Sequence, residues 1–237
     1  MDQKIIGVLG GMGPEATLQF LKLIVSQTPA VKDQDHLRII IDNNPKIPDR
    51  TAAILGEGDS PVPALVQSAQ ALQRAGADFI TIPCITAHYF IEELQDQIDL
   101  PCLSIIEETL RKVTNRPKEF TRIGLLASLG TIKSGIFQNA FSRIGLETVL
   151  PSVEDEALVM RVIYALKNTM GVHDRSRLSE EVLGVVERMC SDTAQATVLG
   201  CTELSLLFPE PTAQPMPLLD PLNILAQAAI RVATPIP

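Results

Sequence analysis

The sequence contains no tryptophan, only 4% aromatic residues and three histidines among 237 residues. Cations are also scarce, because 20 Lys and Arg against 28 Asp and Glu leave a net charge of −8. Proteins that bind nucleic acid concentrate Lys and Arg on one surface, so this balance argues against a nucleic-acid partner. A small anionic ligand would have to be held by a few local cations.

Long apolar runs are missing as well. No stretch approaches the roughly 20 apolar residues of a membrane-spanning helix, and residues 1–4 lead directly into a short apolar run rather than a signal peptide. We therefore expect a cytoplasmic protein without a membrane partner. The four cysteines include no CxxC pair, which predicts reduced thiols rather than a disulfide framework.

Short aliphatic runs alternate with amphipathic stretches of helical period, a pattern typical of parallel sheets flanked by helices. The runs predicted as strands are 5–9, 37–41, 79–82, 103–106, 123–126, 148–150, 197–199 and 216–219. The stretches predicted as helices are 14–27, 60–75, 87–98, 136–144 and 221–232. The predicted fold class is therefore α/β.

The second half of the chain repeats the first at an offset of 117 residues, which aligns Gly7 with Gly124 and Cys84 with Cys201. Such a duplication predicts two similar lobes, each a parallel sheet flanked by helices. Charged residues interrupt the periodicity near 111–120. We expect one lobe to comprise 1–115 plus 209–237 and to carry Cys84, and the other to comprise 116–208 and to carry Cys201.

Cys84 and Cys201 each lie where an apolar strand gives way to a turn, the place where open α/β sheets bind ligands. Backbone N–H groups and the positive end of a helix dipole stabilise a thiolate there. A single cysteine at such a position is usually a packing residue, but two at equivalent positions indicate function. Paired thiols suit a reaction that handles a proton on both faces of one carbon.

Two other interpretations compete. The glycine loop at 10–14 loosely matches a dinucleotide-binding fingerprint with Asp42 as the ribose acid, although the equivalent turn at 127–131 has no such pattern. Cys84 and His88 could supply two metal ligands, but no second pair with metal-like spacing exists. We expect neither a cofactor nor a metal, and a nicotinamide-dependent dehydrogenase is the alternative enzyme class.

Six ordered motifs are present: GVLGGMGPEAT at 7–17, DQDH at 33–36, IPDRT at 47–51, PCITAH at 83–88, GTIKSG at 130–135 and LGCTEL at 199–204. Together they resemble the aspartate/glutamate racemase family, over residues 5 to about 232. The resemblance implies two similar lobes with the active site in the cleft between them. It also implies an amino-acid racemase that interconverts L- and D-aspartate without pyridoxal phosphate, and we expect a homodimer. Glutamate or another amino acid is the alternative substrate.

The resemblance also implies residue roles. Cys84 and Cys201 would flank the substrate α-carbon, one thiolate removing a proton while the opposite thiol delivers another. Arg50 and Lys167 would grip the side-chain carboxylate, and Glu203 would contact the ammonium group or assist Cys201. The other candidate substrate-binding residues, several of them holding the α-carboxylate through N–H and hydroxyl groups, are Met12, Asn43, Ile85, Thr86, Ala87, Thr131 and Thr202.

One position departs from the family pattern. Ile85 stands where the family usually has asparagine after the first cysteine. The backbone N–H survives this change, but the side-chain amide is lost, which affects how the substrate is placed. A catalytically silent ligand-binding protein is therefore a third alternative.

Overall fold

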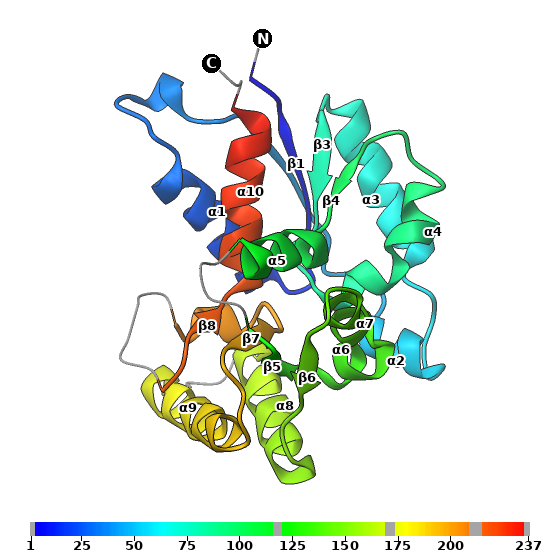
Figure 1. Ribbon diagram of the computed structural model, residues 1–237. Helices are drawn as coiled ribbons and strands as arrows, with labels where there is room; N and C mark the ends of the chain where they lie inside the picture. Colours follow the sequence, from blue (N-terminus) through cyan, green and yellow to red (C-terminus); the bar gives the residue numbers. More distant parts are fainter. Residues whose placement is uncertain (1–2, 116–119, 169–173, 209–214, 235–237) are drawn as a thin grey trace.

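The computed structural model describes residues 3–115, 120–168, 174–208 and 215–234. It contains two four-stranded parallel sheets flanked by helices (Figure 1). The strand orders are β2-β1-β3-β4 and β6-β5-β7-β8, so the second sheet repeats the topology of the first. The predicted α/β class with two similar sheets is confirmed.

The central strands are apolar and buried along nearly their whole length, because helices cover both faces of each parallel sheet. The first sheet comprises β1 (Ile6–Gly10), β2 (Ile39–Asn43), β3 (Phe79–Thr81) and β4 (Cys102–Leu103). The second comprises β5 (Arg122–Ala127), β6 (Glu147–Val149), β7 (Thr197–Gly200) and β8 (Leu218–Leu219).

Most helices begin at a Ser or Asp whose side chain accepts a backbone N–H of the first turn. The helices are α1 (Pro14–Gln27), α2 (Arg50–Leu55), α3 (Val62–Arg74), α4 (Ile91–Gln95), α5 (Ile105–Thr114), α6 (Leu129–Ser134), α7 (Ile136–Arg143), α8 (Val153–Lys167), α9 (Arg175–Ser191) and α10 (Pro221–Ala233). Short 3₁₀ turns cover Asp33–Asp35, Thr86–Phe90 and Leu204–Leu206. Within the described residues, no helix has the length and apolarity needed to cross a membrane.

Several predicted strands are displaced or shortened, with 37–41 observed as Ile39–Asn43 and 216–219 as Leu218–Leu219, and two other elements are wrong in part. The strand predicted over 103–106 ends at Leu103, because the Ser104 hydroxyl accepts the Glu107 N–H and begins α5. The helix predicted over 87–98 is a 3₁₀ turn followed by the short α4. At 103–106 a short apolar run fits both a strand and the start of a helix, and the Ser104 cap decides between them.

The last helix of each half packs against the other half. Helix α5 follows β4 of the first sheet, yet it packs against α7 of the second half. Helix α10 follows β8 of the second sheet, yet it packs against α1 of the first half and against α5 (Figure 1). Because β8 pairs with β7, the expectation that all of 209–237 belongs with the first lobe is wrong for Leu218–Leu219.

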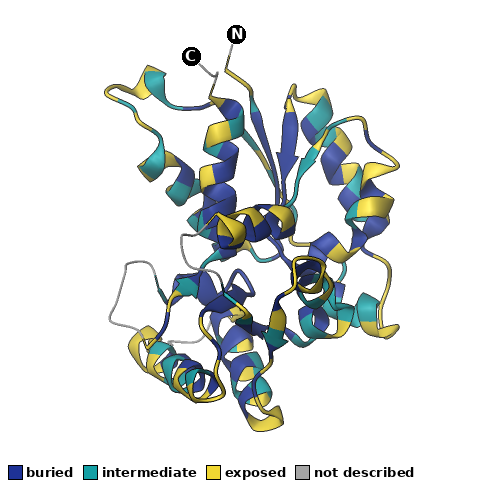
Figure 2. Cartoon of the chain, in the orientation of Figure 1, coloured by how far each residue is buried: buried dark blue, intermediate teal, exposed yellow. Residues whose placement is uncertain are grey.

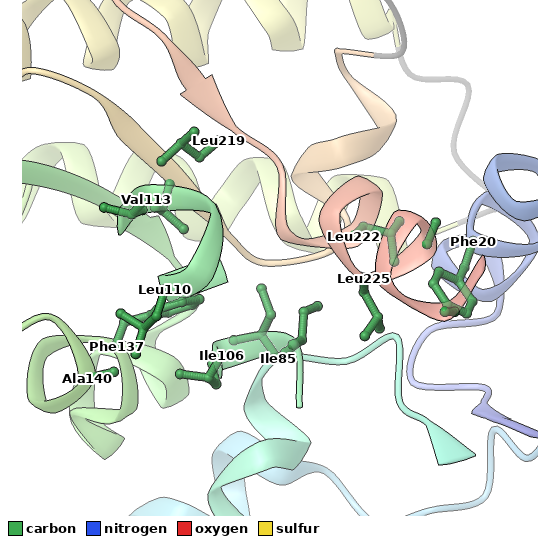
Figure 3. Packing of buried hydrophobic residues seen from close by; sticks show 14 of the residues in the cluster. Phe20, Ile85, Ile106, Leu110, Val113, Phe137, Ala140, Leu219, Leu222 and Leu225 are labelled. Carbon is green, nitrogen blue, oxygen red and sulfur yellow. The ribbon is translucent and has the colours of Figure 1, made fainter. Parts of the chain in front are cut away.

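The largest apolar cluster lies where these helices meet (Figures 2 and 3). It combines side chains of both halves, including Phe20, Ile85, Ile106, Leu110, Phe137 and Leu225. The two halves are therefore joined by a common core, and the pocket described below lies at their junction.

Leu225 is fully buried in α10. We expect Leu225→Ala to lower the free energy of unfolding by about 2–5 kcal/mol, because the truncation leaves a cavity in the shared core. The matched control is Leu18→Ala on α1, where the side chain is 65% exposed and the loss should stay below about 0.5 kcal/mol. Urea unfolding measures both, and equal losses would contradict a shared core centred on α10.

Candidate active site

Both halves contribute to a narrow pocket at the carboxyl ends of the central strands. Cys84 follows β3 and Cys201 follows β7, so equivalent strand ends carry the two thiols. Both cysteines line this pocket and are about 95% buried. The full lining is Met12, Asp49, Arg50, Thr51, Cys84, Ile85, Thr86, Ser128, Lys167, Cys201, Thr202 and Glu203.

His88 holds the turn that carries Cys84. Its Nε2 accepts the N–H of Ile105 at 3.2 Å, so the ring proton is on Nδ1, which donates to the carbonyl oxygen of Cys84 at 2.9 Å. Burial lowers the pKa of His88 to about 4, despite the opposing backbone hydrogen bonds, and the ring is neutral near pH 7. Both ring nitrogens contact backbone, so the metal interpretation of Cys84 and His88 would require breaking one of these bonds.

Glu203 contacts the second thiol. The Sγ of Cys201 donates to Oε2 of Glu203 at 3.0 Å. Burial and the charge of Glu203 raise the pKa of Cys201 well above its usual range, so this cysteine rests as a thiol. Oε1 of Glu203 accepts the N–H of Gly13 at 3.2 Å and lies 3.8 Å from Nζ of Lys167. Glu203 thus links the second thiol to the glycine loop of the first half.

Arg50 brings a cation to the pocket at the start of α2. The Asp49 side chain caps this helix, and Arg50 Nη1 donates to the carbonyl oxygens of Pro48 at 2.9 Å and Ile47 at 3.2 Å. The Nε of Arg50 is buried without a hydrogen-bond partner. This guanidinium is therefore held by backbone contacts, and no carboxylate of the described residues forms an ion pair with it.

Lys167, the last residue of α8, brings a second cation. It follows Arg50 by the same 117 residues that separate the cysteines, so Arg50 and Lys167, like the two thiols, occupy equivalent positions in the two halves. Burial acts to lower the pKa of Lys167, but its acidic neighbours, above all the carboxylate of Glu203, outweigh burial and raise that pKa. The ammonium group is charged at neutral pH.

Three buried hydroxyl groups meet at the junction of the two halves. Thr86 Oγ1 lies 3.0 Å from Thr131 Oγ1 and 3.3 Å from Ser128 Oγ, and the latter two are 3.2 Å apart. Thr86 and Ser128 line the pocket, whereas Thr131 is fully buried and contacts both of their hydroxyl groups. Hydroxyl groups both donate and accept, so this cluster can turn a donor towards a carboxylate without a buried unpaired proton.

The structure brings most of the predicted site residues to one place. Met12, Ile85 and Thr202 line the pocket, and Ala87 is buried in the turn without lining it. Asn43 is exposed at the end of the edge strand β2 and does not line the pocket, so its predicted role is not supported. The sequence interpretation missed Asp49, Thr51 and Ser128; for Ser128, its place in the loop equivalent to 10–14 was an available signal.

A model of the Asp/Glu/hydantoin racemase family matches residues 9–229. The chain belongs to this family. It is similar to the broad specificity amino-acid racemase RacX of Bacillus subtilis, with 26% identity over 232 residues that cover 95% of this chain and 96% of the relative. Its structure is similar to Picrophilus torridus aspartate racemase, with a TM-score of 0.84, 32% identity, and coverage of 97% and 94% of the two chains. The fold is also that of glutamate racemase RacE1 from Bacillus anthracis, with a TM-score of 0.67, 16% identity, and coverage of 98% and 82%.

The contact between Cys201 and Glu203 makes a direct prediction. Glu203→Gln removes the negative charge that disfavours the thiolate, so the pKa of Cys201 should fall. The pH dependence of alkylation, followed on the Cys201 peptide by mass spectrometry, should move to lower pH. Glu15→Gln is the control, because the Glu15 ion pair with Arg175 involves neither pocket thiol. An unchanged or higher midpoint in Glu203→Gln would contradict the assigned contact.

Proposed function

We propose that this member of the racemase family interconverts L- and D-aspartate without pyridoxal phosphate, using Cys84 and Cys201 as its two bases. The observation that carries the proposal is the arrangement of the pocket: two buried thiols and two cations, each pair separated by the repeat offset, line one narrow space. A two-base racemisation needs two such acid–base groups on opposite faces of one carbon.

In one direction, the Cys84 thiolate removes the proton from the α-carbon and becomes a thiol. The Cys201 thiol delivers its proton to the other face and becomes a thiolate. The reverse reaction starts from these exchanged protonation states. Because Glu203 disfavours the Cys201 thiolate, we expect the substrate ammonium group to lie near Glu203 and to offset its charge during the reaction.

The charges of the pocket support a dicarboxylic amino acid. Arg50 and Lys167 supply two positive charges, and Glu203 supplies one buried negative charge. Aspartate carries the complementary set, with two carboxylates and one ammonium group. The hydroxyls of Thr86 and Ser128 are additional donors for the α-carboxylate, where negative charge develops as the proton leaves.

A second candidate is the racemisation of a broader range of amino acids, and Ile85 is the observation that favours it. This residue lines the pocket, so an apolar surface faces the substrate where the family usually has an amide. Ile85 also belongs to the core shared by the two halves (Figure 3). A panel of L-amino acids analysed by chiral chromatography separates the two candidates.

The expectations of a cytoplasmic location and of a homodimer remain predictions.

The central test of the proposal is racemisation of L-aspartate without added cofactor. Chiral chromatography should show approach to a racemate, and Cys84→Ser or Cys201→Ser should each nearly abolish it, because a hydroxyl is far less acidic than a thiol. Cys190→Ser is the matched control, since Cys190 lies on α9 outside the pocket. Near-normal racemisation by either pocket variant would refute the two-thiol mechanism.

The two cations should determine recognition of the dicarboxylate. Arg50→Ala and Lys167→Ala should each raise KM for aspartate at least about tenfold, because each removes a charge-assisted contact worth roughly 1.5–3 kcal/mol. Lys22→Ala, on the exposed face of α1, is the control and should leave KM unchanged. Steady-state kinetics with aspartate measure the effect. Unchanged KM and kcat in both pocket variants would place the carboxylate site elsewhere.

A further inference from the structure

His88 and Ser205 occupy equivalent positions in the two halves. Each stands four residues after a pocket cysteine, so the repeat offset that relates Cys84 to Cys201 also relates His88 to Ser205. Both side chains are buried, and both lie in the 3₁₀ turn that follows the cysteine. Their side-chain chemistry differs, yet their contacts lead to equivalent parts of the fold.

In the first half, His88 connects the thiol turn to the start of α5. Its Nδ1–H donates to the carbonyl oxygen of Cys84, and its Nε2 accepts the N–H of Ile105, the first residue of α5. The neutral ring is required for this pair of contacts, because a protonated ring could not accept the Ile105 N–H. One imidazole therefore joins the backbone of Cys84 to the first residue of α5.

In the second half, Ser205 makes the corresponding connection to α10. The Ser205 hydroxyl donates to Oδ1 of Asp220 at 2.6 Å, and the same oxygen accepts the N–H of Leu222 at 2.9 Å. Asp220 caps α10, and Leu222 is the repeat equivalent of Ile105. Two side chains in this half reach the helix terminus that one histidine reaches in the other.

We propose that His88 and the Ser205–Asp220 pair are matched positioning residues, each of which fixes one thiol-bearing turn to the first turn of α5 or α10. These helices pack against the opposite half, so each tether also sets the position of its thiol relative to the partner thiol. The inference rests on the proposed roles of Cys84 and Cys201. It assigns no proton transfer to His88 or Ser205, since neither lines the pocket.

The tethers predict local effects on thiol accessibility. In the resting protein the buried thiols react with iodoacetamide only through local opening of their turns. His88→Leu removes both contacts of the first tether, so alkylation of Cys84 should rise roughly two- to tenfold per hydrogen bond lost, with Cys201 unchanged. Ser205→Ala should raise alkylation of Cys201 by a similar factor and leave Cys84 unchanged.

Two further measurements separate positioning from general destabilisation. Urea unfolding of each variant reports on general destabilisation, and alkylation of the partly exposed Cys190 on α9 is the internal reference for reagent reactivity in the same sample. His88→Asn retains an N–H donor for the Cys84 carbonyl, and Ser205→Thr retains the hydroxyl, so each should restore much of the protection of its own thiol. These conservative variants also provide folded proteins if His88→Leu does not fold.

Peptide mass spectrometry gives decisive results in either direction. A rise confined to the thiol of the altered half, with partial rescue by the conservative variant, supports the tethers. Equal rises at Cys84 and Cys201, a rise at the opposite thiol, or no change at all would overturn them. The assay needs no substrate, so it tests the tethers even if aspartate is not racemised; failure of racemisation alone would count against the proposed function.

Discussion

The packing of α5 and α10 across the molecule is the constraint on which the pocket depends. Each half ends its sheet with a short strand and then sends a helix onto the other half, α5 onto α7 and α10 onto α1. The apolar side chains of these helices form one core with residues of both halves. Burial of that shared surface fixes the two sheets relative to each other, and the thiols at their strand ends are fixed with them.

The duplication brings equivalent groups together, but it does not give them equal surroundings. Cys84 is followed by Ile85 and Thr86, whereas Cys201 is followed by Thr202 and by Glu203, which accepts a hydrogen bond from the Cys201 thiol. Glu203 raises the pKa of Cys201 while it also contacts the glycine loop and Lys167. The reaction we propose is chemically symmetric, so the bound substrate must compensate for this electrostatic asymmetry.

The sequence predicted the repeated α/β fold and the pairing of the two thiols because both follow from periodicity and from a constant offset. It also placed Arg50, Lys167 and Glu203 at the site through the family resemblance, and the structure brings all three into the pocket. The role of Asn43 remains a prediction, because this residue is exposed at the end of the edge strand β2 and does not line the pocket. Helix α10 was expected with the first lobe and packs against α1 there, whereas the packing of α5 against α7 was not predicted, since it depends on which apolar helix face meets which partner.

Family membership and the pocket constrain the chemistry to different degrees. The family model places the chain among the Asp/Glu/hydantoin racemases, while the two cations and the buried carboxylate are the support for a dicarboxylic amino acid as substrate. Ile85 is the position at which this chain differs from the family pattern. Its apolar side chain lines the pocket where the resemblance leads us to expect a polar one, and it also packs in the shared core. Substrate range and core packing are therefore coupled at this position.

The two-base mechanism is tested most directly by racemisation of L-aspartate in deuterated water, stopped at low conversion. With two thiols on opposite faces, the newly formed D-aspartate should carry deuterium at the α-carbon, while the remaining L-aspartate should retain its proton. Mass analysis of the separated enantiomers measures both. Deuterium that enters the remaining L-aspartate as fast as D-aspartate forms, or D-aspartate that retains the original proton, would contradict the account.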